Sequence, residues 1–222
     1  LNRADGNTLR EAACLNNEGV LLIQSAAHDA AVAVLERCVR LRETLDDEHG
    51  LVIALNNLAA ALSGSGNLDR AVGVLNRARM VAARNGLGRQ RNLALVNLSV
   101  AYARRGQLRD AQRVVRQLRR HCRVDNDWDA HARALFNGGC AAIDMGRPIN
   151  AQACAERLDL LHDLHSNCAR ELNGDIVRAE LAYRSRDWAH LHTLVARLHG
   201  LGIRGPKVAV YEDRVAIEAG DP

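Results

Sequence analysis

The residues in this sequence best suited to chemistry are asparagines that recur at one spacing. One position of a repeating pattern holds Asn17, Asn57, Asn97 and Asn137. A carboxamide offers an oxygen acceptor and two N–H donors, but asparagine is about 0.6 kcal/mol less favourable than alanine inside a helix. A polar group retained at that cost in four equivalent places indicates hydrogen bonding, either to a ligand or to a neighbouring helix.

Other candidate chemistry is sparse. His162, His165 and Cys168 have i, i+3, i+6 spacing, but a metal site needs three or four convergent ligands, so solvated histidines are the better interpretation. Cys38 falls where the repeat has alanine and is expected in the core, and Cys140 has no histidine predicted beside it to act as a base. The glycine-rich segment 63–67 follows no strand, as a phosphate-binding loop would. We therefore predict no catalytic residue, no metal, no cofactor and no enzymatic activity.

Composition favours an all-helical protein. The 222 residues are 48% apolar and only 3% aromatic, with three prolines, and alanine, leucine and arginine favour helix. No apolar stretch approaches the roughly 18 residues of a membrane span, and no signal-peptide pattern is present. Six cysteines without a CxxC spacing are typical of reduced thiols in a cytoplasmic protein. Because the chain begins without methionine, we expect a segment of a longer protein.

The net charge of +4 comes from basic and acidic residues that alternate along the chain. Arginine accounts for nearly all the positive charge, which a GC-rich coding sequence also produces. We therefore expect no dominant phosphate-binding surface, and neither nucleic acid nor a membrane is predicted as a partner.

Sliding the sequence against itself by the spacing of these asparagines aligns five copies without a net insertion. A small residue occupies one position in all five copies: Gly19, Ala59, Ser99, Gly139 and Ala179. A turn position further along each copy holds Ala26, Gly66, Gly106, Gly146 and Arg186. Within the second copy, Leu55, Leu58, Ala59 and Leu62 form one apolar helical face. Each copy is thus predicted to be a helical hairpin that buries its apolar face by stacking on its neighbours.

The chain resembles the tetratricopeptide repeat (TPR) family over roughly residues 9 to 201. The large residue, the small residue four later, the glycine and the later alanine of that family's pattern match Leu55, Ala59, Gly66 and Ala71. The period is roughly 40 residues, longer than the common form of about 34, and the usual aromatic positions are mostly aliphatic. These features look most like the kinesin-light-chain branch and the MalT-like and Rap-type bacterial regulators.

The resemblance implies an all-α, right-handed superhelical solenoid that occupies residues 1–222 as a single domain. The expected repeats are 9–50, 51–90, 91–130, 131–167 and 168–205, followed by a terminal helix at 206–219 that is a cap or half of a sixth hairpin. If a further repeat is exposed there, self-association through this end is expected.

The asparagine position lies roughly 150° from the apolar face of its helix, a direction that is the concave wall in a right-handed stack. The predicted peptide-binding residues are Asn17, Asn56, Asn57, Val96, Asn97, Val100, Arg133, Phe136 and Asn137. In similar repeat proteins, asparagine at this position holds a bound peptide or a partner carboxylate. The alternative is that the carboxamides hydrogen-bond between neighbouring helices and only set the superhelix.

Two functions remain open on the sequence alone. The first is a peptide- or protein-binding scaffold that uses the concave face, as the sensor or interaction module of a bacterial regulatory or signalling protein. The second is a structural or self-associating array whose arginine-rich outer face contacts nucleic acid or another domain. A repeat fold defines the architecture but not the partner.

Overall fold

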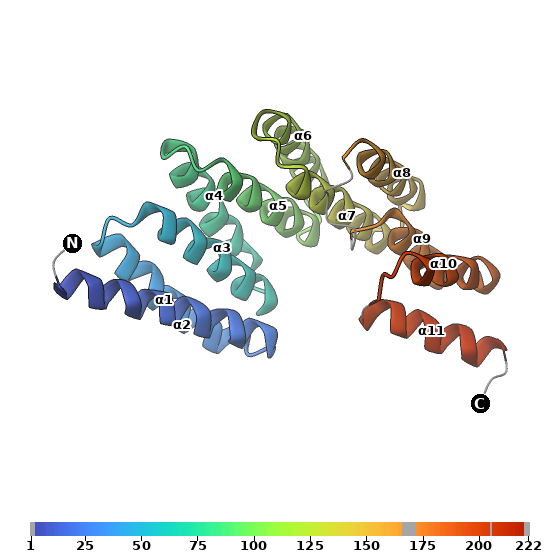
Figure 1. Ribbon diagram of the computed structural model, residues 1–222, viewed down its shortest axis with the longest axis horizontal. Coiled ribbons are helices and arrows are strands. Elements are labelled where there is room, and N and C mark those ends of the chain that lie inside the picture. Colours follow the sequence, from blue (N-terminus) through green and yellow to red (C-terminus); the bar gives the residue numbers. More distant parts are fainter. Residues whose placement is uncertain (1–2, 166–171, 205, 220–222) are drawn as a thin grey trace. The chain divides into compact units, whose positions relative to one another are not determined.

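The computed structural model describes residues 3–165, 172–204 and 206–219, which form eleven helices and no strand (Figure 1). The helices are α1 (Arg3–Gln24), α2 (His28–Thr44), α3 (Glu48–Gly64), α4 (Leu68–Arg84), α5 (Gly88–Arg104), α6 (Leu108–Asp125), α7 (Trp128–Asp144), α8 (Pro148–Leu164), α9 (Gly174–Ser185), α10 (Trp188–Gly200) and α11 (Pro206–Ala219). The predicted all-α repeat fold is confirmed: five helical hairpins are followed by one terminal helix.

The chain divides into two compact units, residues 1–130 and 131–222, which we describe separately. A single solenoid domain over 1–222 stays a prediction. Within the first unit, α3 begins at Glu48, slightly before the predicted repeat boundary at Leu51. Asp47 sets this start, because its carboxylate accepts a hydrogen bond from the Gly50 amide at 3.0 Å and so satisfies one of the free amides of the first turn.

Every predicted turn position adopts a left-handed backbone. The φ angles are +59° at Ala26, +82° at Gly66, +74° at Gly106, +64° at Gly146 and +59° at Arg186. A second series of left-handed residues ends α2, α4 and α6, at Asp46, Gly86 and Asn126. The chain therefore reverses twice in each of the first three repeats, and each reversal ends one helix and starts the next.

The small residues of the repeat allow the two helices of a hairpin to approach closely. A Cβ added to Gly19 would lie 2.5 Å from Leu35 Cγ. Ala59 is 1% exposed, and Ala71, on the facing helix of the same hairpin, is fully buried. Larger side chains at these positions would push α1 away from α2, or α3 away from α4, so the repeat needs small residues there.

In the second unit, α11 packs on α9 and α10. Tyr211 of α11 is 2% exposed, and its hydroxyl donates to Glu180 Oε2 at 2.5 Å. The guanidinium of Arg214 lies 5.0 Å from the centre of the Trp188 ring, at cation–π distance. Val210 and Ile217 remain 52% and 62% exposed. Self-association through this end of the chain stays a prediction.

The turn geometry makes a stability prediction. A non-glycine residue in the left-handed region costs about 1 kcal/mol, so Ala26→Gly is expected to raise the free energy of unfolding by about 0.5 kcal/mol after the added chain entropy of glycine is subtracted. Gly66→Ala is expected to lower it by about 1 kcal/mol, and an added Cβ at Gly66 meets no atom within 4 Å, so no packing change is mixed in. Urea unfolding followed by circular dichroism measures both. A neutral Gly66→Ala variant would contradict the left-handed turn.

Candidate functional site

The first helices of the hairpins form an inner layer in residues 3–130. Their backbones approach one another, α1 with α3 and α3 with α5. Across the same residues, the second helices α2, α4 and α6 show no such backbone approach, and α2 meets α4 through long side chains such as Arg70 with Glu36. A stack whose first helices are closer together than its second helices curves toward the first. We call α1, α3 and α5 the inner layer.

The asparagines connect neighbouring helices of the inner layer. Asn57 Nδ2 donates to Asn16 Oδ1 at 2.9 Å, and Asn97 Nδ2 donates to Asn56 Oδ1 at 3.3 Å. Both bonds join residues 41 positions apart. Asn56 Nδ2 in turn donates to the Val52 carbonyl at 3.0 Å. The carboxamides therefore form hydrogen bonds between hairpins, as the second interpretation of the asparagine pattern expected.

These bonds leave part of each carboxamide available. Asn17 is exposed, while Asn57 and Asn97 are half-buried. In the part of the chain that the structure describes, no donor reaches the Oδ1 atom of Asn57 or Asn97. Each of these side chains thus donates an N–H group to the neighbouring helix, and its oxygen can still accept a hydrogen bond from another partner.

Two of the predicted peptide-binding side chains are covered. Asn56 is 3% exposed and Val96 is 2% exposed. Asn56 is covered because it bonds to its own helix and to Asn97 of the next hairpin. Neither side chain offers a surface to a ligand, so their role is to position the inner layer.

On each inner-layer helix, the residues four positions before and three positions after the asparagine are also exposed or half-buried. Ile53 and Leu93 are 36% and 42% exposed, although their size suggests core residues. We call the resulting surface the inner strip; its members are exposed or half-buried, and they are Ala13, Asn17, Val20, Ile53, Asn57, Ala60, Leu93, Asn97 and Val100. All of them are uncharged. The i, i+4, i+7 spacing around each asparagine could have revealed Ile53 and Leu93.

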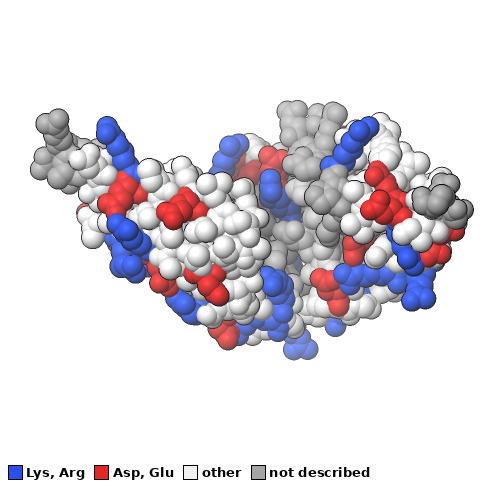
Figure 2. All heavy atoms as spheres, turned by 90° about the horizontal axis from the view of Figure 1, so that it is seen from below, with Lys and Arg blue, Asp and Glu red and all other residues white. Residues whose placement is uncertain are grey.

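One charged residue, Arg104, follows the inner strip at the end of α5. Arg104 is exposed, and its Nη1 donates to the Ser63 carbonyl at 2.8 Å, which ties the end of α5 to the last turn of α3. Elsewhere Figure 2 shows basic and acidic atoms next to one another over the face in view. The inner strip itself contains no charged side chain.

The remaining predicted residues belong to the second unit. Arg133 is exposed, and Asn137 is half-buried. Phe136 is half-buried and packs against the core that α9, α10 and α11 form. A binding groove that continues from Asn97 to Asn137 stays a prediction.

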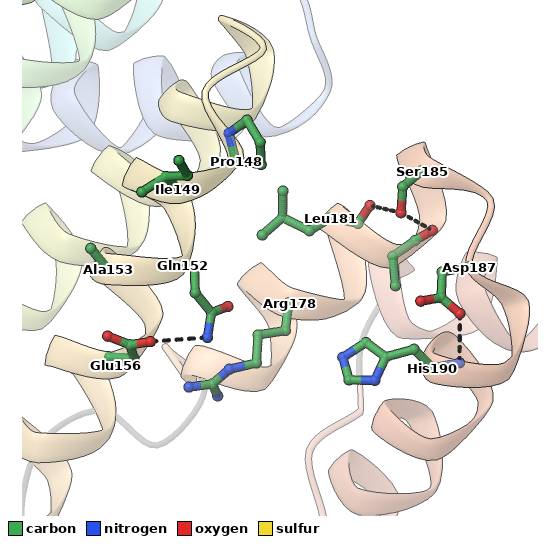
Figure 3. A pocket seen from close by; sticks show the side chains of 11 residues that line it. Pro148, Ile149, Gln152, Ala153, Glu156, Arg178, Leu181, Ser185, Asp187 and His190 are labelled. Atoms are coloured by element: carbon green, nitrogen blue, oxygen red, sulfur yellow. Dashed lines mark hydrogen bonds between the residues drawn. The ribbon is translucent and has the colours of Figure 1, made fainter.

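A groove of about 530 Å³ lies between α8, α9 and α10 of the second unit (Figure 3). Leu181 and Arg178 project from α9 between α8 and the His190 ring of α10. The Arg178 guanidinium is held by Asp159 at 2.5 Å and Asp175 at 2.8 Å. Burial acts to lower the Arg178 pKa, but these hydrogen bonds outweigh it and raise that pKa. Because three successive helices build this groove, no single motif predicts it.

Several other polar groups of the groove are also engaged within the protein. Gln152 donates to Glu156 at 3.2 Å, and the Asp187 carboxylate accepts from the His190 amide at 3.1 Å (Figure 3). Pro148, Ile149 and Leu181 add apolar surface. Among the lining residues, these groups do not form a nucleophile with an adjacent base.

The structure describes five of the six cysteines, and no group of His, Cys, Asp and Glu in the described ranges could hold a metal ion. Cys168, the third member of the histidine and cysteine cluster, lies outside those ranges. Cys38 is fully buried, and its thiol donates to the Ala12 carbonyl at 3.1 Å. The expectation that Cys38 belongs to the core is confirmed. None of the helices described is long and apolar enough to cross a membrane.

Comparison with known proteins shows the fold. Two crystal structures of a putative kinesin light chain with nearly identical TPR-like repeats, from Podosopora anserina, resemble this chain. One, a variant, has a TM-score of 0.62 and 17% identity over 85% of this chain and 92% of its own. The other has a TM-score of 0.60 and 16% identity over 91% and 95%. No protein-family model and no curated protein matches.

These likenesses define the class of structure: a TPR-like helical repeat. The more specific resemblance to the MalT-like and Rap-type regulators stays a prediction.

The cysteines make a reactivity prediction. Burial raises the pKa of Cys122 to about 12 and also raises the pKa of Cys38, so at pH 8 both remain protonated thiols, which are poor nucleophiles. Cys14 is exposed. We expect brief treatment with iodoacetamide at pH 8 to label Cys14 well before Cys38 or Cys122, as read by peptide mass spectrometry. Equal labelling in urea is the control, and early labelling of Cys122 in the native protein would contradict its burial.

Proposed function

We propose that this protein is a non-enzymatic scaffold whose inner layer binds an extended, mainly uncharged peptide or partner segment. The observation that carries the proposal is the inner strip: three successive first helices present the same uncharged pattern of apolar and carboxamide side chains to solvent. A quarter of the chain is charged, so a neutral surface repeated three times indicates selection for apolar contact.

The chemistry of the strip suggests how such a ligand is held. The Oδ1 atoms of Asn57 and Asn97 can accept hydrogen bonds from backbone N–H groups, which every peptide offers whatever its sequence. Ile53 and Leu93 supply apolar area, which contributes about 25 cal/mol per Å² buried. Affinity from the backbone and selectivity from apolar side chains is a recurrent mode of peptide recognition. Asn17 and Val100 extend the same pattern along the layer.

Two finer elements belong to the same proposal. Arg133, Phe136 and Asn137 of the second unit, at repeat positions equivalent to Leu93, Val96 and Asn97, also contribute to peptide binding. The chain serves as the sensor or interaction module of a cytoplasmic bacterial regulatory or signalling protein. The TPR-like fold supports a role in protein interaction, in keeping with the general use of such repeats as binding surfaces.

A peptide-array screen tests the site. We expect the wild-type protein to retain a set of peptides rich in apolar residues, and the Ile53→Gln/Leu93→Gln variant to bind them roughly tenfold or more weakly, because two exposed apolar contacts are lost. The matched control is Met80→Gln/Leu160→Gln, which changes side chains 48% and 61% exposed on α4 and α8. The control is expected to bind within twofold of wild type. Equal binding by both variants would remove the inner strip from the proposal.

The asparagines are tested separately, because their substitution affects stability. Asn57→Ala/Asn97→Ala removes two hydrogen bonds between hairpins, each contributing about 1 kcal/mol, so the variant is expected to melt earlier. At a temperature where circular dichroism shows it as helical as wild type, it is expected to lose the peptides that the wild type retains. Unchanged peptide binding at that temperature would assign these asparagines to structure alone.

A further inference from the structure

An arginine face runs along the whole of α6. Five arginines follow one another at intervals of four, three, four and three residues, and all are exposed: Arg109, Arg113, Arg116, Arg120 and Arg123. This spacing keeps them on one side of the helix. At about 1.5 Å per residue, the stripe is about 21 Å long. Arg119 adds a sixth exposed guanidinium. We call these residues the α6 stripe.

The stripe is barely neutralised by the protein itself. Asp110 pairs with Arg113 within the helix, and Asp125 is used by Arg91 of α5. Throughout the residues that the structure describes, the other five arginines of the stripe have no carboxylate partner. The expectation of no dominant basic surface, drawn from the alternation of charges along the whole chain, does not hold for this helix.

The neighbouring helix explains the lack of partners. On α2, Glu36 and Glu43 pair with Arg70 and Arg77 of α4, 34 residues later. One repeat further on, the positions of the two glutamates hold Asn76 and Ala83, and those of the two arginines hold Asp110 and Gln117. The ion-pair ladder therefore stops at α4. The one carboxylate on α4, Asp69, pairs with Arg105, so α4 leaves no acidic side chain for the stripe.

We propose that the α6 stripe binds the phosphate backbone of a double-stranded nucleic acid without reading its base sequence. Guanidinium groups hydrogen-bond phosphate oxygens in a bidentate manner, and a duplex presents about one charge per 1.7 Å of its axis. The length and charge of the stripe match such a partner.

The composition of the stripe separates a nucleic acid from a protein partner. Protein interfaces bury an apolar centre depleted of charge, whereas nucleic-acid interfaces are polar and strongly positive. The stripe consists of arginines only. Single-strand binding needs aromatic side chains on which bases stack, and α6 has no Phe, Tyr or Trp. The partner is therefore a duplex contacted along its backbone.

Fluorescence anisotropy with labelled 24-base-pair DNA and RNA duplexes of mixed sequence tests this, at 50 to 200 mM salt. The test variant is Arg116→Gln/Arg120→Gln/Arg123→Gln, since glutamine preserves helix propensity. The control is Arg40→Gln/Arg84→Gln/Arg89→Gln, which removes the same charge from exposed positions on α2, α4 and α5. We expect the test variant to lose tenfold or more in affinity, and its log K against log salt slope to become shallower by about 2 to 3. The control is expected to change less than threefold, and circular dichroism should be unchanged in both.

Several outcomes would overturn the proposal. One is no duplex binding by the wild type at 50 mM salt, and another is an equal loss of affinity in test and control variants. Tighter binding of a poly-glutamate peptide than of either duplex would show that the stripe receives an acidic protein. Tighter binding of a single strand would exclude a duplex-specific contact. If the wild type binds a duplex as expected, the duplex that it binds more tightly, DNA or RNA, is the partner.

Discussion

The left-handed residue at the end of each helix from α1 to α7 is the constraint on which the rest of the structure depends. It returns at a regular spacing, at Ala26, Asp46 and Gly66 and onward, so the helices from α2 to α5 all have 17 residues. Equal helices place equivalent side chains at equivalent heights in successive hairpins. Hydrogen bonds in the inner layer therefore join residues 41 apart. Ion pairs in the outer layer, which the second helices α2, α4 and α6 form, join residues 34 apart. The backbone determines which residues of neighbouring hairpins face each other, and the side-chain types determine whether a hydrogen bond or an ion pair forms there.

The two layers differ in their exposed side chains: those of the inner layer are neutral, and those of the outer layer are largely charged. In the inner layer, carboxamides bond across hairpins and leave a neutral strip that includes Ile53 and Leu93. In the outer layer, α2 and α4 are joined by arginine–glutamate pairs, which are largely exposed and contribute little to stability individually. Such pairs neutralise charge more than they hold helices together. This register ends after α4, because the next equivalent positions hold Asn76 and Ala83 with Asp110 and Gln117, and the exposed arginines of α6 stand at other positions of their helix. One repeat can thus present two unlike surfaces, because the exposed residues of its first helix and those of its second helix can change independently.

Much of the fold could be predicted from the sequence, because the period, the turn positions and the small residues each have a local cause. The exposed side of the asparagine position could not. A helical wheel describes one helix, whereas the burial of Asn56 and Val96 depends on a neighbouring helix 41 residues away. Ile53 and Leu93 were missed since large apolar side chains are usually core residues. The arginines of α6 were visible, but averaging charge over the whole chain concealed them. The groove beside Arg178 needs three helices in place and has no local signal.

The choice of asparagine in the inner layer follows from its half-buried position. Asn57 must donate to Asn16 and still face solvent. Alanine would leave the Asn16 carboxamide without this donor, and an unmade buried hydrogen bond costs about 1 to 3 kcal/mol. Lysine or glutamate would bring a charge into a layer that contains no counter-charge at that position, and glutamine would lose more side-chain entropy on being fixed. A short neutral carboxamide is the side chain that donates inward and accepts outward at once, so the group that joins the hairpins is also the group that a ligand would meet.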